Sequence, residues 1–163
     1  MPPDASKRGP DAARKETQVR LGFQGPDDLF VCSPGDRSRL EADAMVWEYQ
    51  YQGSQWKWCA KTLPRADFTA SSMLRLKLRS DRGGDLFVKL EEDDKEAYFA
   101  IIPAGPEWSS VTLALDELAI DPSTRRNGRL DRNKLTTLIF ADAAGTEAAK
   151  GRRSVWIKDL ELR

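Results

Sequence analysis

Histidine is absent from this 163-residue chain, and cysteine occurs only twice. Without histidine the commonest general base is missing, and so is every Ser-His or Cys-His nucleophile pair. Cys32 and Cys59 cannot supply the four ligands, mostly Cys and His, of a standard zinc site. We therefore expect no metal site of this kind. We treat both thiols as small buried residues, because a disulfide would require an oxidising compartment and no export signal is visible, and we keep a bridge between them as the alternative.

Other signatures of catalysis are missing as well. The chain has no glycine-rich phosphate loop and no Asp-rich calcium loop of the EF-hand type. Paired carboxylates remain, but the acidic residues at 91–94 are adjacent in sequence and are typical of a solvated hairpin tip. We expect no enzyme and no cofactor.

Long hydrophobic runs and an excess charge of either sign are also lacking. Lys plus Arg and Asp plus Glu both number 26, so the formal net charge is zero. No apolar run approaches the length of a membrane span. A field that would attract nucleic acid or a membrane to the whole protein is therefore absent, and we expect neither partner.

The first 20 residues are rich in Pro, Ala and charge and lack the apolar centre of a secretory signal. They predict a disordered tail or linker, with a basic arm that touches a polyanion as the alternative. Residues 21–163 are then one domain, which we expect to be monomeric. If this is a domain of an exported protein, it works outside the cell or in the periplasm.

What the chain does contain is many short alternating runs separated by turn residues. This pattern predicts an all-β protein, an antiparallel two-sheet β-sandwich of the jelly-roll type. The expected strands are 27–32, 44–52, 55–61, 72–80, 85–92, 96–102, 107–115, 135–141 and 154–162. The side chains expected to face the core are Met45, Trp47, Tyr49 and Tyr51 in one strand, Leu138 and Phe140 in another, and Phe99 and Ile101 in a third.

One stretch, 73–90, reads MLRLKLRSDRGGDLFVKL and predicts a hairpin around a Gly-Gly turn. Because side chains alternate faces along a strand, its leucines would be buried. Its outer face would then carry one row of Arg75, Lys77, Arg79, Phe87 and Lys89. That row could bind a ligand, or it could form cross-strand ion pairs with acidic neighbours.

The second half carries a family resemblance. From Trp108 the chain continues through an L-DEL turn, a loop ending in Gly-Arg-Leu-Asp, a Leu-x-x-Leu-Ile-Phe strand and a closing aromatic-Ile-x-Asp-Leu-x-Leu strand. Residues 107–163, and more weakly 40–106, resemble jelly-roll carbohydrate-binding modules with a galactose-binding-like fold that accompany glycoside hydrolases. The resemblance implies non-catalytic binding of a polysaccharide or oligosaccharide near an attached or partner enzyme. We expect a β-glucan or a similar polysaccharide, held on the outer face of one sheet.

The resemblance also implies a structural calcium held partly by an acid in the closing strand. Lys158 stands at that position here, and Asp159 follows it. Calcium needs oxygen ligands, which an ammonium cannot supply. We therefore expect no calcium, unless Asp159 or Glu161 takes over through a shifted register.

Sugar-binding sheets combine flat aromatic rings with planar polar groups. Trp47, Trp108 and Trp156 fall in core motifs and are expected to be packing residues. Trp56 and Trp58 share one strand face and are either an exposed stacking platform or the rim of the core. The candidate carbohydrate-binding residues are the stacking side chains Trp56, Trp58, Phe87 and Tyr98 and the polar side chains Gln50, Arg75 and Arg79.

Two other functions remain open from the sequence. The domain could be a structural or protein-interaction jelly roll whose charged face meets another chain. It could also bind a polyanion through two basic loops, provided that they meet in space. Those loops contain Arg125, Arg126, Arg129, Arg132 and Lys134 in one and Lys150, Arg152 and Arg153 in the other.

Overall fold

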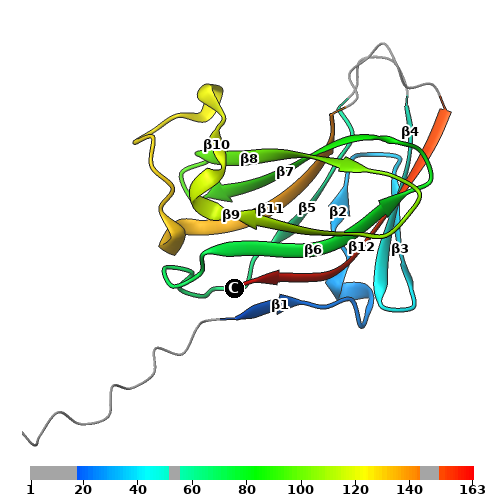
Figure 1. Ribbon diagram of the computed structural model, residues 1–163, viewed down its shortest axis with the longest axis horizontal. Coiled ribbons are helices and arrows are strands. Elements are labelled where there is room, and N and C mark those ends of the chain that lie inside the picture. Colours follow the sequence, from blue (N-terminus) through cyan, green and yellow to red (C-terminus); the bar gives the residue numbers. More distant parts are fainter. Residues whose placement is uncertain (1–17, 52–55, 144–150) are drawn as a thin grey trace, which may run out of the picture.

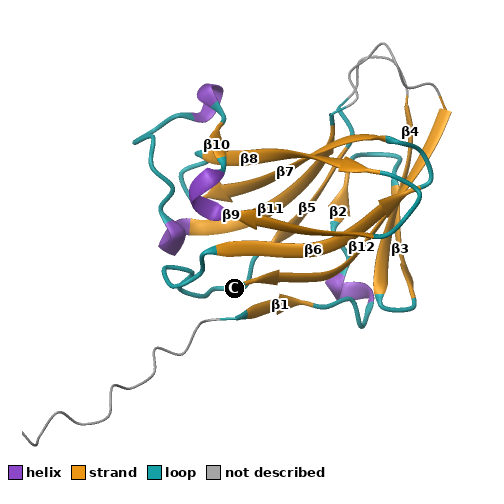
Figure 2. Ribbon diagram, viewed as in Figure 1, coloured by secondary structure: helices purple, strands orange, loops and turns teal. Residues whose placement is uncertain are grey.

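The computed structural model describes residues 18–51, 56–143 and 151–163, and these form a β-sandwich (Figures 1 and 2). Its strands are β1 (Val19–Leu21), β2 (Val31–Cys32), β3 (Arg37–Glu41), β4 (Ala44–Tyr51), β5 (Trp58–Thr62), β6 (Met73–Ser80), β7 (Gly84–Glu92), β8 (Ala97–Ala104), β9 (Ser109–Ala114), β10 (Ala119–Ile120), β11 (Leu135–Asp142) and β12 (Gly151–Leu162). Four short 3₁₀ helices span Pro26–Asp28, Leu115–Glu117, Pro122–Thr124 and Arg132–Lys134. In these described ranges no helix has the length and apolarity needed to cross a bilayer.

The strands form two six-stranded antiparallel sheets. Sheet A has the order β3-β4-β12-β6-β9, with β1 also paired to β12, and sheet B has the order β10-β8-β7-β11-β5-β2. The chain passes from one sheet to the other between β4 and β5, between β5 and β6, and between β6 and β7. This repeated crossing is the connectivity of a jelly roll, so the predicted fold class is confirmed.

The core lies between the sheets and follows the alternation of the sequence. Met45, Trp47 and Tyr49 of β4 point inward, as do Leu138 and Phe140 of β11. These inward positions were predicted correctly. Val31 and Ile101 are apolar but exposed, because they occupy outward positions of sheet B.

The predicted hairpin at 73–90 is wrong. Its two strands, β6 and β7, belong to different sheets: β6 pairs with β9 and β12, whereas β7 pairs with β8 and β11. Residues 81–83 connect the two sheets and do not form a tight hairpin turn. The expected single row is therefore divided, with Arg75, Lys77 and Arg79 outside sheet A and Phe87 and Lys89 outside sheet B.

The predicted orientation of β8 is also wrong. Tyr98 and Ile102 face the core with 5% exposure each, whereas Phe99 and Ile101 face outward. Both faces of this strand carry large apolar side chains, so alternation of polarity could not identify the buried face.

A bulge in β12 lets one strand serve two neighbours. Residues 151–157 pair with β4, and residues 160–162 pair with β1. Between them the register with β6 shifts, and Asp159 adopts a φ of 50°. An extra residue of this kind bends a strand and increases its twist. Val19 and Arg20, which the sequence placed in the N-terminal tail, pair with β12 through this arrangement.

A buried ion pair joins the two sheets. Arg153 of β12 donates from Nη1 to Asp142 Oδ2 of β11 at 2.9 Å, and the two side chains are 5% and 1% exposed. The hydroxyls of Tyr49 and Tyr51 also donate to Asp142. The same guanidinium donates to Ser80 Oγ at 2.8 Å and to the carbonyl oxygen of Gly84 at 3.1 Å.

Gly84 makes this contact possible. Its φ is +147°, and a Cβ added there would meet the Arg153 guanidinium at about 3.4 Å. A side chain at this position would therefore be strained and would push against the buried cation.

We predict that Asp142→Ala lowers the free energy of unfolding by about 3–5 kcal/mol, because it leaves the buried Arg153 charge without its carboxylate. Urea denaturation followed by tryptophan fluorescence measures the change. The double variant Asp142→Leu, Arg153→Met should recover most of the loss. The control Asp43→Asn, at an exposed carboxylate, should change the free energy of unfolding by less than about 0.5 kcal/mol. A loss below about 1 kcal/mol for Asp142→Ala would show that the pair is not a major support of the sandwich.

Candidate functional site

The outer face of sheet B carries an open groove with a volume of about 680 Å³. Its floor and walls come from β5, β7, β8 and β11 and from the segment after β10. The groove is lined by Trp56, Trp58, Ala60, Phe87, Lys89, Glu91, Lys95, Phe99, Asp121, Pro122, Thr137, Ile139 and Ala141. We call this feature the sheet B groove.

Strand register arranges the lining in rows across the sheet. One row runs Trp58, Ala141, Phe87 and Ile101, and the next runs Ala60, Ile139, Lys89 and Phe99. A third row places Thr137 beside Glu91. Neighbouring strands are about 4.8 Å apart, so small side chains between large ones leave a depression. Ala141 has this effect between Trp58 and Phe87, and Ala60 has it beside Ile139.

A buried ion pair sets the orientation of the tryptophans. Lys57 lies between Trp56 and Trp58 in sequence, and its ammonium is inside the protein, 3.0 Å from Asp36 Oδ1. The Lys57 side chain is 6% exposed and the Asp36 side chain 1%. Because Lys57 points inward, the residues on either side of it point outward. Ser33 fixes the same strand by exchanging hydrogen bonds with the backbone of Trp58.

Three aromatic rings form a continuous cluster in the groove. The ring centroids of Trp56 and Phe87 are 5.8 Å apart, and those of Phe87 and Phe99 are 5.5 Å apart. Trp56 is 65% exposed, whereas Phe87 and Phe99 are half-buried. The two phenylalanines meet edge to face and support the exposed indole, which leaves a large apolar ring available to a ligand.

Polar groups border this aromatic cluster in oppositely charged pairs. Lys89 Nζ lies 3.1 Å from Asp121 Oδ2, and Lys95 Nζ lies 3.0 Å from Glu91 Oε1. Hydrogen bonds from Ser123 hold the pKa of Asp121 below its usual value, and the ammonium of Lys89 contributes to the same direction. The border of the groove thus offers both donors and acceptors with no excess of either charge.

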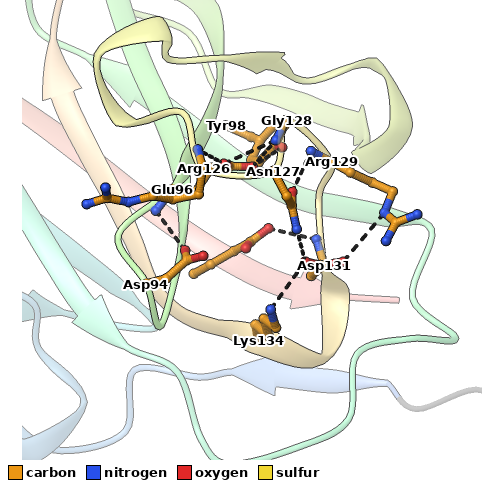
Figure 3. A network of polar contacts seen from close by, with 10 residues as sticks. Asp94, Glu96, Tyr98, Arg126, Asn127, Gly128, Arg129, Asp131 and Lys134 are labelled. Atoms are coloured by element: carbon orange, nitrogen blue, oxygen red, sulfur yellow. Dashed lines mark hydrogen bonds and ion pairs between the residues drawn. The ribbon is translucent and has the colours of Figure 1, made fainter.

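The segment that carries Asp121 and Pro122 belongs to a long connection between β10 and β11, and Glu96 anchors this connection (Figure 3). The Glu96 carboxylate is fully buried and accepts hydrogen bonds from the amides of Arg126 and Gly128 and from the Tyr98 hydroxyl. Burial raises the pKa of Glu96, but these hydrogen bonds outweigh it, and the net shift is downward.

A second buried carboxylate, Glu92, accepts a hydrogen bond from the amide of Asp131 at 2.7 Å. Burial raises the pKa of Glu92. Asp131 in turn accepts a hydrogen bond from Asn127 and forms ion pairs with Arg129 and Lys134. Glu92 and Glu96 lie at the two ends of the turn between β7 and β8, and both hold the connection that carries Asp121 and Pro122.

The structure brings together only some of the residues singled out from the sequence. Trp56, Trp58 and Phe87 line the sheet B groove. Gln50, Arg75 and Arg79 lie outside sheet A, on the other side of the sandwich. Tyr98 is buried and donates its hydroxyl to Glu96 Oε1 at 2.5 Å, so it is not the exposed stacking residue that the sequence suggested.

On sheet A the cations are engaged locally. Arg75 lies 3.7 Å from Glu161, and Lys77 lies 3.4 Å from Asp159. The guanidinium of Arg79 lies 4.0 Å from the ring centroid of Trp156 and 5.5 Å from that of Trp108. The second of the two readings of this row, ion pairs with acidic neighbours, describes Arg75 and Lys77.

The expected packing role holds for one of three tryptophans. Trp47 is completely buried in the core. Trp156 is half-buried on the outer face of sheet A, and Trp108 is 39% exposed beside it. Arg79 and Lys158 cover their ring faces, the latter 4.5 Å from the Trp108 centroid. Trp108 and Trp156 are therefore packed by stacked cations and not by the core contacts expected from the sequence.

The two basic loops do not meet. Arg125 to Lys134 precede β11, whereas Arg152 and Arg153 follow its other end, and the two regions lie at opposite ends of the sandwich (Figure 1). Arg153 is buried against Asp142, and Arg152 pairs with Glu48 at 2.5 Å. Lys150 and the Gly53-Ser54 turn lie outside the described residues. The described residues of the two loops therefore form no combined basic patch of the kind that a polyanion would need.

Sequence reasoning missed Phe99, Ile139 and Asp121 as groove residues. Phe99 was expected to face the core, and neither Ile139 nor Asp121 was among the candidate binding residues. The available signal was the register, since Ile139 and Phe99 lie in one row with Lys89, but register requires knowledge of which strands pair.

The residues that the structure describes hold no group of three or more Cys, Asp or Glu side chains placed to bind a metal ion. At the position where the resemblance implied a calcium ligand, the Lys158 ammonium lies 4.0 Å from Asp43. The expectation that this chain binds no calcium remains a prediction.

Glu96 should make the stability of the protein depend on acid pH. Because its folded pKa lies below its unfolded value of about 4.5, its contribution is complete above that value and is lost as the pH falls through the folded pKa. We expect Glu96→Gln to lower stability at neutral pH and to flatten the decline between about pH 5 and pH 3. Urea unfolding across this range measures both effects, with Glu117→Gln at an exposed site as the control. Parallel curves for the wild type and Glu96→Gln would contradict this role.

Comparison with known proteins places the chain among modules of one architecture. No family model and no curated protein matches the sequence. Among solved structures, a family 11 carbohydrate-binding module from the Clostridium thermocellum cellulase Lic26A-Cel5E has a TM-score of 0.61 at 12% identity, covering 89% of this chain and 86% of that one.

A second structure of this family 11 module, in complex with a β-1,3-1,4-mixed-linked tetrasaccharide, has a TM-score of 0.59 at 13% identity and covers 89% of this chain and 87% of that one. A family 29 module, CBM29-2, has a TM-score of 0.62 at 18% identity and covers 90% and 91%. This chain therefore resembles carbohydrate-binding modules and has their β-sandwich jelly-roll fold.

Proposed function

We propose that this protein is a non-catalytic carbohydrate-binding domain whose ligand lies in the sheet B groove. The observation that carries the proposal is the aromatic cluster of Trp56, Phe87 and Phe99, with an indole 65% exposed beside paired donors and acceptors. A contiguous aromatic surface rimmed by polar residues is typical of a ligand-binding groove, and the apolar face of a pyranose ring is a suitable partner for an exposed indole.

The polar border supports the same ligand class. Hydroxyl groups of a sugar both donate and accept hydrogen bonds. Lys89 and Lys95 can donate to them, and Asp121, Glu91 and the Thr137 hydroxyl can accept. Groups of both kinds beside a stacking ring are what a polar ligand with apolar ring faces requires.

The charge pairing favours a neutral polysaccharide over an acidic one. Each groove lysine already has a carboxylate within about 3 Å, so an acidic sugar would have to compete with Asp121 or Glu91. A β-glucan is the ligand class we propose, supported by the mixed-linked tetrasaccharide and the cellohexaose in structures of similar fold. Such binding would hold a polymer near an attached or partner glycoside hydrolase.

The residues outside sheet A are not part of this proposed site. Gln50, Arg75 and Arg79 were candidates from the sequence, and they remain the alternative location for a ligand. The ion pair of Arg75 with Glu161 and the stacking of Arg79 on Trp156 favour the sheet B groove instead.

Trp56→Ala should reduce the affinity for a soluble β-glucan by roughly tenfold or more, because it removes the exposed stacking ring. Affinity electrophoresis in gels containing β-glucan measures the loss, with laminarin, mixed-linked glucan and an acidic polysaccharide run in parallel. The melting temperature should change little, since the indole is mostly exposed.

The matched control is Trp108→Ala, which removes a partly exposed indole beside sheet A. It should leave the retardation unchanged, as should the double variant Arg75→Ala, Arg79→Ala. If that double variant lost binding while Trp56→Ala kept it, the ligand would lie on sheet A. If the wild type were retarded by none of the polymers, the domain would be better explained as an interaction module.

Binding of a neutral glucan should also be nearly independent of salt. Between about 0.05 and 0.5 M NaCl we expect the dissociation constant to change by less than about twofold, because screening acts on charge–charge attraction. Isothermal titration calorimetry at both salt concentrations tests this. A steep loss of affinity at high salt would indicate a polyanionic ligand.

A further inference from the structure

The two cysteines of this chain lie directly opposite each other on neighbouring strands. Cys32 of β2 is the register partner of Cys59 of β5, and both are free thiols. Cys59 is fully buried in the core, and Cys32 is partly exposed and packs against that core. The two side chains therefore point to the same face of sheet B.

A neighbouring hydrogen bond shows whether Cys32 and Cys59 form a hydrogen-bonded or a non-hydrogen-bonded pair of the antiparallel ladder. The amide of Ser33 donates to the carbonyl oxygen of Trp58 at 2.9 Å, so residues 33 and 58 form a hydrogen-bonded pair. Because pairs alternate along an antiparallel ladder, Cys32 and Cys59 form a non-hydrogen-bonded pair. In such pairs the Cα atoms are about 4.5 Å apart and the side chains are at their closest.

This spacing falls at the lower end of the range that a disulfide requires, with Cα atoms about 4.4–6.8 Å apart. We propose that Cys32 and Cys59 form an intramolecular cross-strand disulfide when the protein meets a small-molecule disulfide or an oxidised thiol–disulfide oxidoreductase. The bond would attach the short edge strand β2 to the strand that carries Trp58.

The environment of the two thiols gives them different roles. A hydrogen bond from the Cys59 thiol lowers the pKa of Cys32, whereas burial raises the pKa of Cys59. Cys32, which is partly exposed, is thus the better nucleophile. The buried Cys59 is placed to attack the mixed disulfide that forms on Cys32.

With oxidised glutathione as the oxidant, the reaction balances in two steps. The Cys32 thiolate attacks one glutathione sulfur, and the first glutathione leaves with the electron pair of the broken S–S bond. The Cys59 thiol then loses its proton, its sulfur attacks Cys32, and the second glutathione leaves. Two protein thiols are oxidised to one disulfide, and one oxidised glutathione is reduced to two thiols.

The test uses the full chain incubated with oxidised glutathione and, separately, with dithiothreitol. We expect the oxidised sample to lose both thiols in a denaturing thiol assay and to weigh two hydrogen atoms less. A non-reduced tryptic digest should link peptide 21–37 to peptide 58–61. Because the bond closes a loop of the unfolded chain, the melting temperature should rise by roughly 5–10 °C.

Two variants separate the roles of the cysteines. Cys59→Ser should stop at a stable glutathione adduct on Cys32, and Cys32→Ser should not react while it is folded. If either variant fails to fold, the wild type still decides, since brief alkylation should label Cys32 before Cys59. A glutathione adduct in the wild type, a disulfide-linked dimer, or two unreacted thiols after oxidation would each overturn the proposal. None of these outcomes depends on carbohydrate binding.

Discussion

The sandwich depends on one buried contact between its sheets, the ion pair of Arg153 with Asp142. A pair this deeply buried contributes modest net stability relative to apolar packing, because desolvation offsets much of the attraction. The observed alignment of β12 over β11 satisfies both charges together with the hydroxyls of Tyr49 and Tyr51, and a shift would leave these buried groups without partners. Leucine and phenylalanine side chains alone would tolerate several alignments.

The position of the groove follows from that alignment. With β11 held in place, its outward residues Thr137, Ile139 and Ala141 form the middle of the floor. At the opposite end of the sandwich, Glu96 and Glu92 hold the connection that bears Asp121 through backbone amides. Buried charges thus support the groove from both ends, while the groove itself carries the exposed indole of Trp56.

Local patterns in the sequence were sufficient for the fold class and for most inward positions, because alternation along a strand reports which face is buried. They failed where both faces are apolar, as at Phe99, and where pairing decides neighbours, as at Arg75 and Phe87. The Gly-Gly segment between β6 and β7 is compatible with either a hairpin or a crossing, and only the competition among long-range pairings distinguishes them. Of the seven candidate residues from the sequence, three lie in the groove, namely Trp56, Trp58 and Phe87.

The alternation along these strands also separates the residues that can contact a ligand from the residues that build the core. In β5, β7 and β11, the residues that line the groove alternate with residues that face the interior of the sandwich. The lining residues can therefore be substituted while the core residues stay the same. The solved structures of similar fold keep this architecture at only 12–18% identity to this chain, as expected if many outward positions are free to vary. For protein engineering, the outward positions of these three strands can be varied in a library while the core keeps the scaffold fixed.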